Sequence, residues 1–198
     1  MIGNIFVFLS SYLIGSVPFA FITGKLVKGI DIRYAGEGNV GARNVLHTVG
    51  KPYGIIVGIL DALKGVIVAI LCLSLNLSFT TIVIGGFGVV LGHDFPIFLG
   101  FKGGKGLATA IGFLLILFPL PMVVSLTFML IMFSIRRYFH FAVSIGIGSL
   151  PILWMPLFKN SFKEIIFTIS YLSFLGIKRL IDEPHMREVK KKSGWDKG

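Results

Sequence analysis

Two long apolar stretches of the chain are separated by the polar hexapeptide Phe101-Lys102-Gly103-Gly104-Lys105-Gly106. A second glycine-rich island, Gly36-Glu37-Gly38-Asn39-Val40-Gly41-Ala42-Arg43-Asn44, lies about 60 residues upstream. Glycine allows backbone N–H groups to turn toward an anion, and lysine adds a full positive charge. The two islands therefore predict a site for phosphate-bearing substrates beside the lipid.

The composition indicates an integral membrane protein. Of the 198 residues, 55% are hydrophobic and 14% are charged, whereas soluble domains carry about 25% charged residues. The net charge of +10 does not indicate a nucleic-acid partner, because the chain has no basic stripe with interleaved aromatic residues. The lone Cys72 cannot form an internal disulfide. No basic region precedes the N-terminal apolar run, so we expect a retained span and not a cleaved signal peptide.

Hydropathy predicts an all-α bundle of seven transmembrane helices. A span needs about 20 mostly apolar residues. The candidates are residues 4–24, 53–75, 79–99, 106–119, 121–136, 141–158 and 162–178. The fourth and fifth form one stretch broken at Pro119-Leu120-Pro121, which fits either a helical hairpin in the bilayer or one kinked helix. We expect residues 1–180 to form one transmembrane domain and residues 181–198 a short polar cytosolic tail.

Lysine and arginine residues predict the orientation of the chain. They gather in the first, third and fifth loops and in the C-terminal tail, and they are absent from the second loop and the Pro119 turn. The sixth loop, with Lys159 and Lys163, is the exception. The positive-inside rule then places the N-terminus outside and the C-terminus and both glycine-rich islands in the cytoplasm. Most of the positive charge would face the anionic inner leaflet.

The hexapeptide at residues 101–106 predicts a phosphate cradle at a helix start. Gly106 precedes the next span, where the first backbone N–H groups of a helix lack partners and its dipole is positive. Lys102 and Lys105 add charge. The alternative is a plain hairpin whose lysines only fix topology. Residues 36–41 also match G-x-G-x-x-G, but no βαβ unit surrounds them, which argues against a dinucleotide site.

Polar residues inside the spans allow structural and catalytic interpretations. Asp61 and Lys64 lie three residues apart and predict an ion pair, structural before catalytic. His93 is either a hydrogen-bonded packing residue or a base. Ser16, next but one to Pro18, either satisfies a backbone carbonyl or presents its hydroxyl to the site. No second His or Cys lies at metal-ligand spacing, so we expect no metal.

Six stretches share their residues, order and spacing with a known family. They are Gly15-Ser16-x-Pro18 with Lys25, Gly29-x-Asp31-x-Arg33, Gly36-x-Gly38-Asn39-x-Gly41-Ala42-x-Asn44, Asp61-x-x-Lys64-Gly65, Gly92-His93-x-Phe95-Pro96, and Phe101-Lys102-Gly103-Gly104-Lys105-Gly106-x-Ala108-Thr109. Together they resemble the PlsY family of membrane glycerol-3-phosphate acyltransferases, which use acyl phosphate as donor. The resemblance is dense over about residues 12–112 and looser elsewhere.

The resemblance implies transfer of a fatty acyl group from acyl phosphate to the 1-hydroxyl of glycerol 3-phosphate, giving lysophosphatidic acid. It also implies seven spans in a bacterial plasma membrane, a cytoplasmic active site, no cofactor, and an enzyme that supplies acyl phosphate. The catalytic candidates are Ser16, His93 and Lys105, together with Arg43, which departs from the family pattern. The substrate-binding candidates are Lys25, Gly36, Gly38, Asn39, Gly41, Asn44, Lys102, Gly103, Gly104 and Gly106. Acyl phosphate is already activated, so positioning and charge stabilisation could supply most of the rate.

This chain departs from the family pattern at polar positions of the site. Glu37 and Arg43 stand where the family has Ser and Thr, and His47 stands where it has Arg. Ser173 and Gly176 align with a His and an Asn of the C-terminal motif.

The departures suggest a compensation. Positions 43 and 47 share a helix face, so we expect Arg43 to replace the missing arginine. Glu37 is expected to pair with Arg43 or to act as base for a different acceptor. His140 and His185 are candidates for the lost histidine. Two alternatives remain, a divergent paralogue with altered or impaired activity and a small transporter. The motifs and the absence of an internal repeat disfavour the transporter.

Overall fold

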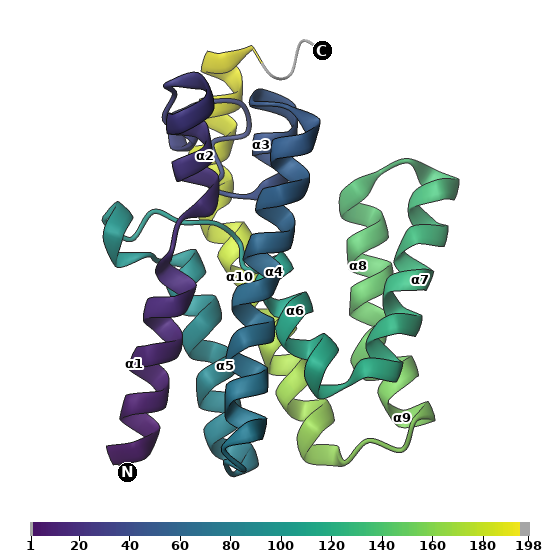
Figure 1. Ribbon diagram of the computed structural model, residues 1–198. Helices are drawn as coiled ribbons and strands as arrows, with labels where there is room; N and C mark the ends of the chain where they lie inside the picture. The colour runs from purple at the N-terminus through teal and green to yellow at the C-terminus, as the bar shows by residue number, and fades with distance from the viewer. Residues whose placement is uncertain (1, 195–198) are drawn as a thin grey trace. The chain divides into compact units, whose positions relative to one another are not determined.

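The computed structural model describes residues 2–194, and every regular element in that range is helical (Figure 1). The chain forms two compact units. The first comprises residues 2–113 and 175–194 of the described range, and the second comprises Leu114–Phe174. The chain leaves the first unit within α6 (Leu107–Leu117) and returns within α10 (Phe162–Ser193).

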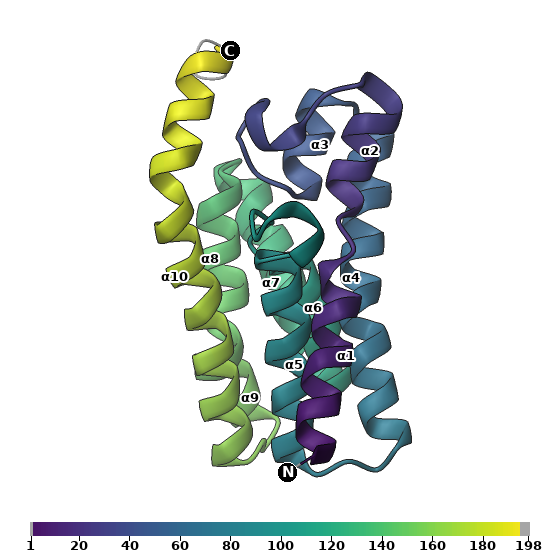
Figure 2. The same ribbon diagram turned by 90° about the vertical axis from the view of Figure 1, so that its left-hand side faces the viewer.

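The first unit is built on three closely packed helices, α1 (Ile2–Ser16), α4 (Lys51–Ser74) and α5 (Phe79–Asp94). Glycines on α5 allow α1 to approach closely. A methyl group on Gly88 would lie 2.9 Å from the carbonyl oxygen of Phe8, so small residues set this helix contact. Figure 2 shows α1 running beside α5.

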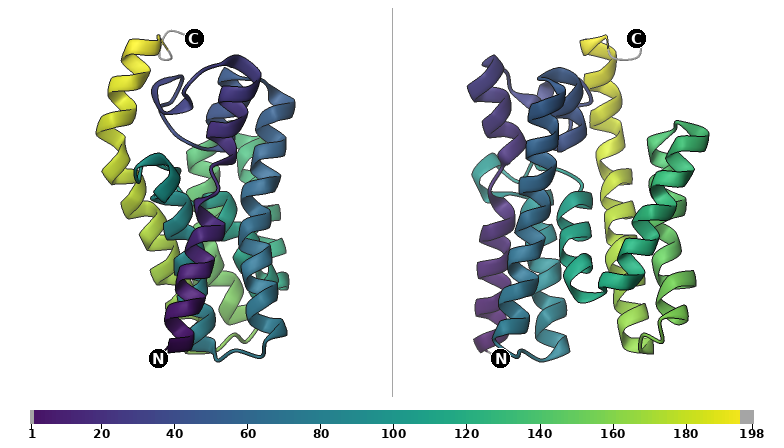
Figure 3. Two further views of the ribbon diagram at one scale, coloured as in Figure 1. Left: turned by 60° about the vertical axis from the view of Figure 1, so that its left-hand side comes forward. Right: turned by 45° about the vertical axis from the view of Figure 1, so that its right-hand side comes forward.

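The first predicted span is broken. α1 ends at Ser16, and α2 (Phe19–Lys28) begins after Val17 and Pro18, as Figure 3 shows. Pro18 lacks a backbone N–H, and the Ser16 hydroxyl donates to the carbonyl of Tyr12 at 2.8 Å. This hydrogen bond agrees with the structural interpretation of Ser16.

The polar loops of the first unit lie toward one end of the helices. The first loop contains the 3₁₀ turn η1 (Ile32–Tyr34) and α3 (Ala42–Thr48), and η2 (Ile97–Leu99) follows α5. The last turns of α10, which are yellow in Figure 2, lie at the same end as α2 and α3, opposite the start of α1. The predicted tail is therefore helical as far as Ser193, and its cytosolic location stays a prediction.

The second unit contains a helical hairpin. α7 (Pro119–Arg136) and α8 (Phe139–Ser149) run antiparallel (Figure 3), and Ser125 Oγ donates to the carbonyl of Gly146 at 2.6 Å. A π-helical turn, η3 (Leu150–Trp154), and α9 (Met155–Leu157) lead to the start of α10. α6 ends at Leu117 and α7 starts at Pro119, with Phe118 non-helical between them, so one continuous kinked helix is excluded.

Five helical segments of the described chain have the length and apolarity of membrane spans: Ile2–Lys28, Lys51–Ser74, Phe79–Leu99, Pro119–Arg136 and Phe139–Leu157. α6 is a shorter apolar helix and coincides with the expected span 106–119. The last expected span, 162–178, lies in the first half of α10. The fold is thus that of an all-helical membrane protein.

Candidate active site

Asn44 shapes the first glycine-rich loop. It is fully buried, and its side-chain oxygen accepts the N–H of Glu37 at 2.9 Å. Its amide nitrogen donates to the carbonyls of Ile32, Ala35 and Asn39 at 3.1, 2.9 and 2.9 Å. These bonds use the amide to hold the loop, so a direct contact between Asn44 and substrate stays a prediction.

Glu37 points inward and pairs with Arg43. Its neighbours Gly36 and Gly38 have φ angles of 58° and 68°, in the left-handed region that glycine favours. Glu37 is only 1% exposed, and its Oε1 lies 2.7 Å from Nη1 of Arg43 on α3. The predicted pairing of Glu37 with Arg43 is confirmed. His47, one turn further along α3, is exposed.

The second glycine-rich loop is held against the end of α5. The N–H of Gly103 donates to the carbonyl of Asp94 at 3.2 Å, and the N–H of Gly104 donates to that of His93 at 3.1 Å. Protein carbonyls thus occupy both N–H groups, and the predicted substrate-binding role of Gly103 and Gly104 stays a prediction. In the described residues, by contrast, the N–H groups of residues 105–109 have no acceptor. The anion site predicted at the start of α6 therefore has backbone donors available to it.

The glycines of this loop are required by close approach. A methyl group on Gly104 would lie 2.6 Å from the carbonyl oxygen of Val40 and would overlap the His93 ring. Gly106 has a φ of 64°, and a methyl group there would lie 3.0 Å from Oδ1 of Asp94. The contact between Gly104 and Val40 brings the two glycine-rich loops together, as the sequence predicted.

Lys105 lies where the two loops meet and is half-buried. The pKa of Lys105 is lowered to about 8, mainly by burial and also by the nearby cations Arg179 and Lys190, against the opposing effect of Glu37 and Asp182. Burial and nearby cations destabilise the charged ammonium group, so a bound anion would stabilise it strongly.

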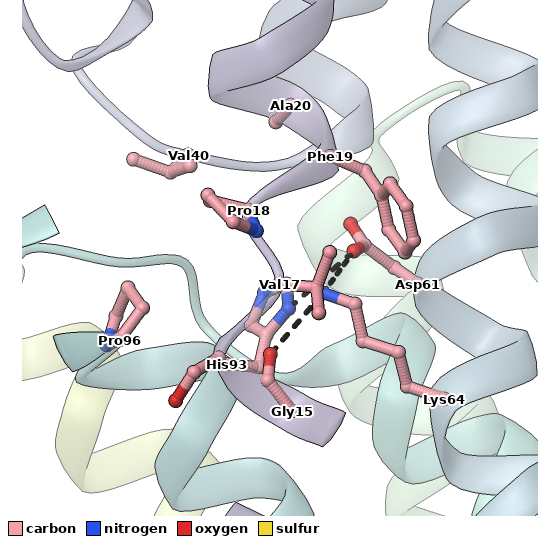
Figure 4. A pocket seen from close by; sticks show the side chains of 11 residues that line it. Gly15, Val17, Pro18, Phe19, Ala20, Val40, Asp61, Lys64, His93 and Pro96 are labelled. Carbon is pink, nitrogen blue, oxygen red and sulfur yellow. Dashed lines mark hydrogen bonds and ion pairs between the residues drawn. The ribbon is translucent and has the colours of Figure 1, made fainter. Parts of the chain in front are cut away.

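A second charged cluster is buried between α1, α4 and α5 (Figure 4). Asp61 Oδ1 lies 2.8 Å from Lys64 Nζ, which confirms the predicted ion pair, and 3.6 Å from His93 Nδ1. Lys64 also donates to the carbonyl of Gly15 at 3.3 Å. The cluster lines a small pocket that Ser16 also borders. His93 joins the two regions, since its other ring nitrogen, Nε2, faces Gly104.

Two predicted site residues, Lys25 and Lys102, are exposed, whereas Lys105 is half-buried. Lys25 is exposed on α2, with its ammonium group 5.9 Å from the centre of the Phe21 ring. Lys102 is exposed on its loop. Among the other candidates, Asn39 and Gly41 pack together within the first loop, where a methyl group on Gly41 would lie 2.9 Å from Asn39 Nδ2.

Asp31 and Arg33 fasten the first loop. Arg33 Nη2 lies 2.7 Å from Asp31 Oδ2, and Arg33 Nη1 donates to the carbonyl of Leu99 at 3.2 Å. The hydrogen bond from Arg33 lowers the pKa of Asp31. This pair ties the loop to η2.

The contribution of α10 was missed by sequence reasoning. Val189 packs on Gly38, and the Ser193 hydroxyl donates to the carbonyl of Gly36 at 3.0 Å. His185 Nε2 lies 3.1 Å from the carbonyl oxygen of Arg33, so this candidate histidine contacts the loop backbone. The available signal was the apolar pair Met186 and Val189, three residues apart in a charged segment.

The other candidate histidine, His140, lies away from the glycine-rich loops in sequence, on α8. His140 lies in the second unit, with its ring against those of Tyr138 and Phe139. Within residues 2–194, no group of three or more His, Cys, Asp or Glu side chains is arranged to hold a metal ion.

The structure combines the apolar helices of a membrane protein with a glycine-rich helix start that carries Lys105. The family model for glycerol-3-phosphate acyltransferase matches residues 5–183. The chain belongs to this family, which confirms the resemblance seen in the sequence.

Named relatives agree along most of the chain. A glycerol-3-phosphate acyltransferase of Desulforamulus reducens is 39% identical over 87% of this chain and 86% of its own length. That of Alkaliphilus metalliredigens is 36% identical over 98% and 95%. The crystal structure of PlsY, an integral membrane glycerol 3-phosphate acyltransferase in its glycerol 3-phosphate form, superposes with a TM-score of 0.83 at 32% identity. The match covers 97% of this chain and 93% of PlsY.

Proposed function

We propose that the protein transfers a fatty acyl group from acyl phosphate to the 1-hydroxyl of glycerol 3-phosphate, giving lysophosphatidic acid for phospholipid synthesis. The observation that carries this proposal is the contact of the two glycine-rich loops, which places Lys105 beside Glu37 and the cations of α10. The PlsY structures in glycerol 3-phosphate and lysophosphatidic acid forms support the acceptor and the product.

The chemistry needs positioning more than a protein nucleophile. The 1-hydroxyl oxygen attacks the acyl carbon, the bond from that carbon to the phosphate oxygen breaks, and the hydroxyl proton passes to the departing phosphate. Lys105 and the free N–H groups at the start of α6 hold phosphoryl oxygens and offset the charge that develops on them. Holding both substrates in one pocket makes the reaction effectively unimolecular.

Arg43 takes the phosphate-binding role of the arginine that is missing at position 47. It is one-third exposed, so its guanidinium reaches both Glu37 and an incoming substrate. The ion pair with Glu37 holds the guanidinium of Arg43 in place. The remaining loop candidates, Gly36, Gly38, Asn39 and Gly41, act by giving the loop its shape.

The topology follows from the same proposal. Seven segments cross a bacterial plasma membrane, with the N-terminus outside and the C-terminus and the active site in the cytoplasm. The alternation of basic loops supports this orientation. A separate enzyme supplies acyl phosphate, and apolar surface such as Ile55 and Ile59 on α4 faces lipid.

The buried Glu37 favours one second candidate, acylation of a different polyol phosphate. At position 37 a carboxylate replaces the hydroxyl of the family pattern. This carboxylate pairs with Arg43 and acts on the charge of Lys105, so we expect the acceptor site to differ from that of other members. In this version Glu37 accepts the proton of the acceptor hydroxyl.

The test is an acyl transfer assay with the purified protein in bilayers. Radiolabelled glycerol 3-phosphate and palmitoyl phosphate are supplied, and lysophosphatidic acid is measured against a panel of polyol phosphates. We expect turnover, with glycerol 3-phosphate as the preferred acceptor. Preference for another acceptor would establish the second candidate, and binding without turnover would identify an impaired paralogue. The absence of both binding and turnover would contradict the two acyltransferase candidates and would leave the transporter.

A further inference from the structure

The C-terminal turns of α10 cover the first glycine-rich loop. Three contacts fix them there: His185 at the carbonyl of Arg33, Val189 on Gly38, and Ser193 at the carbonyl of Gly36. Val189 is buried and sits so close to Gly38 that a methyl group on this glycine would lie 2.8 Å from its Cβ. This segment therefore packs on the loop whose Glu37 acts on Lys105.

The cations on this segment are not equivalent. Arg187 pairs with Glu183 at 3.1 Å and Lys192 pairs with Glu188 at 2.6 Å, each one turn away on α10 itself. Lys190 is half-buried, and in the described part of the chain its ammonium group forms no ion pair. Its positive charge acts on the carboxylate of Glu183, also on α10, and on the ammonium group of Lys105.

Two half-buried ammonium groups near each other are unfavourable without an anion. Partial burial removes water from both charges, and their mutual repulsion is poorly screened there. Glu37 is a carboxylate that could neutralise them, but its Oε1 already lies 2.7 Å from Nη1 of Arg43. An anion that binds between Lys105 and Lys190 would relieve both costs.

We propose that Lys190 is a phosphate-binding residue of the acceptor site, and that the C-terminal turns of α10 place it there. The ligand is a phosphomonoester dianion, whose oxygens accept hydrogen bonds from the ammonium groups of Lys190 and Lys105. The proposal rests on the proposed function and deepens it. The C-terminal segment then becomes part of the binding site and not a plain extension.

The experiment compares Lys190→Gln with Lys191→Gln, a matched control that removes the same charge from the exposed neighbouring residue. For Lys190→Gln we expect the KM for glycerol 3-phosphate to rise at least about tenfold, the loss typical of a charge-assisted hydrogen bond, with a smaller change in the KM for acyl phosphate. Lys190→Arg should restore most of the affinity. Equal KM values for the two glutamine variants would overturn the proposal, and a rise confined to acyl phosphate would assign Lys190 to the donor and overturn the acceptor assignment.

A second readout separates binding from a structural effect. The charged groups that act on Lys105 are Glu37 from the first loop and Arg179, Asp182 and Lys190 from α10. Removal of Lys190 should therefore raise the pH at which kcat/KM falls on the alkaline side, whereas Lys191→Gln should leave it unchanged. A profile for Lys190→Gln identical to that of the wild type would contradict the proposal.

Failure of the proposed function can be told apart from failure of this inference. If the wild-type protein shows no acyl transfer, equilibrium binding of glycerol 3-phosphate to the same three variants replaces KM. Weaker binding by Lys190→Gln alone would support Lys190 as a phosphate ligand, and equal binding by all variants would exclude it.

Discussion

The clusters around Asp61 and Lys105 both combine cations with a buried carboxylate, yet their charges are balanced differently. Asp61 lies within ion-pair distance of both Lys64 and His93, and Lys64 also reaches the carbonyl of Gly15. Around Lys105, the carboxylates of Glu37 and Asp182 pair with Arg43 and Lys178, and Lys190 adds a further positive charge. A balanced cluster stabilises the helices, and an unbalanced one is suited to a substrate anion.

The largest expected effect concerns the balanced cluster. Asp61→Ala leaves Lys64 buried without its partner, and loss of one member of a buried pair costs about 3–5 kcal/mol of stability. We expect a markedly lower melting temperature of the purified protein in detergent. The double variant Asp61→Asn with Lys64→Met should recover most of it, and a melting temperature unchanged in Asp61→Ala would break the comparison.

The next effect concerns Arg43. Arg43→Gln removes a phosphate-binding cation and the partner of the buried Glu37, so we expect the KM for glycerol 3-phosphate to rise about 10- to 100-fold, from the loss of charged hydrogen bonds worth about 1.5–3 kcal/mol. Glu37→Gln should have the opposite effect on KM, because it frees Arg43 for the substrate. Steady-state kinetics at fixed acyl phosphate measure both, and normal affinity in Arg43→Gln would count against its role.

Gly104→Ala tests whether the two glycine-rich loops must touch. The added methyl group meets the His93 ring and the carbonyl of Val40, and such overpacking costs about 1–3 kcal/mol. We expect lower kcat/KM and a modestly lower melting temperature. Gly148→Ala is the control, because nothing lies within 4 Å of the added methyl group there, and equal effects of the two variants would argue against a required contact.

The smallest effect is a shift along the pH axis. Lys105, with a pKa of about 8, binds phosphate only when protonated, so kcat/KM for glycerol 3-phosphate should fall as the pH rises through about 8. Lys105→Arg stays charged over this range and should move the fall to higher pH. A wild-type profile that stays flat as the pH rises through about 8 would show that Lys105 does not titrate in the site.

Local patterns predicted much of the fold and part of the site. Apolar length identified the helices Lys51–Ser74 and Phe79–Asp94, and spacing identified the pair of Asp61 and Lys64. The approach of His93 to Asp61 escaped prediction, because periodicity within α5 does not reveal which face meets α4. For the same reason the packing of α10 on the first loop was not predicted, because a charged segment is expected to be solvent-exposed when its partner is unknown. Only the apolar residues Met186 and Val189, which are buried, indicated a packed face.

The hydrogen bonds of the Gly103 and Gly104 N–H groups also could not be predicted from the sequence. Glycine and lysine composition indicated an anion site but not which backbone donors remain available. The carbonyls of His93 and Asp94, at the end of the preceding helix, take two of them. The sequence predicted free N–H groups at the start of α6, and in the described residues those of residues 105–109 have no acceptor.

The central claim, that the unbalanced cluster around Lys105 binds the substrate phosphate, is tested most directly by equilibrium titration of glycerol 3-phosphate into Lys105→Gln and Lys51→Gln. Both variants lose one positive charge, but Lys51 is an exposed residue at the start of α4. The account predicts binding at least about tenfold weaker in Lys105→Gln and wild-type affinity in Lys51→Gln. Equal affinities for all three proteins would contradict it.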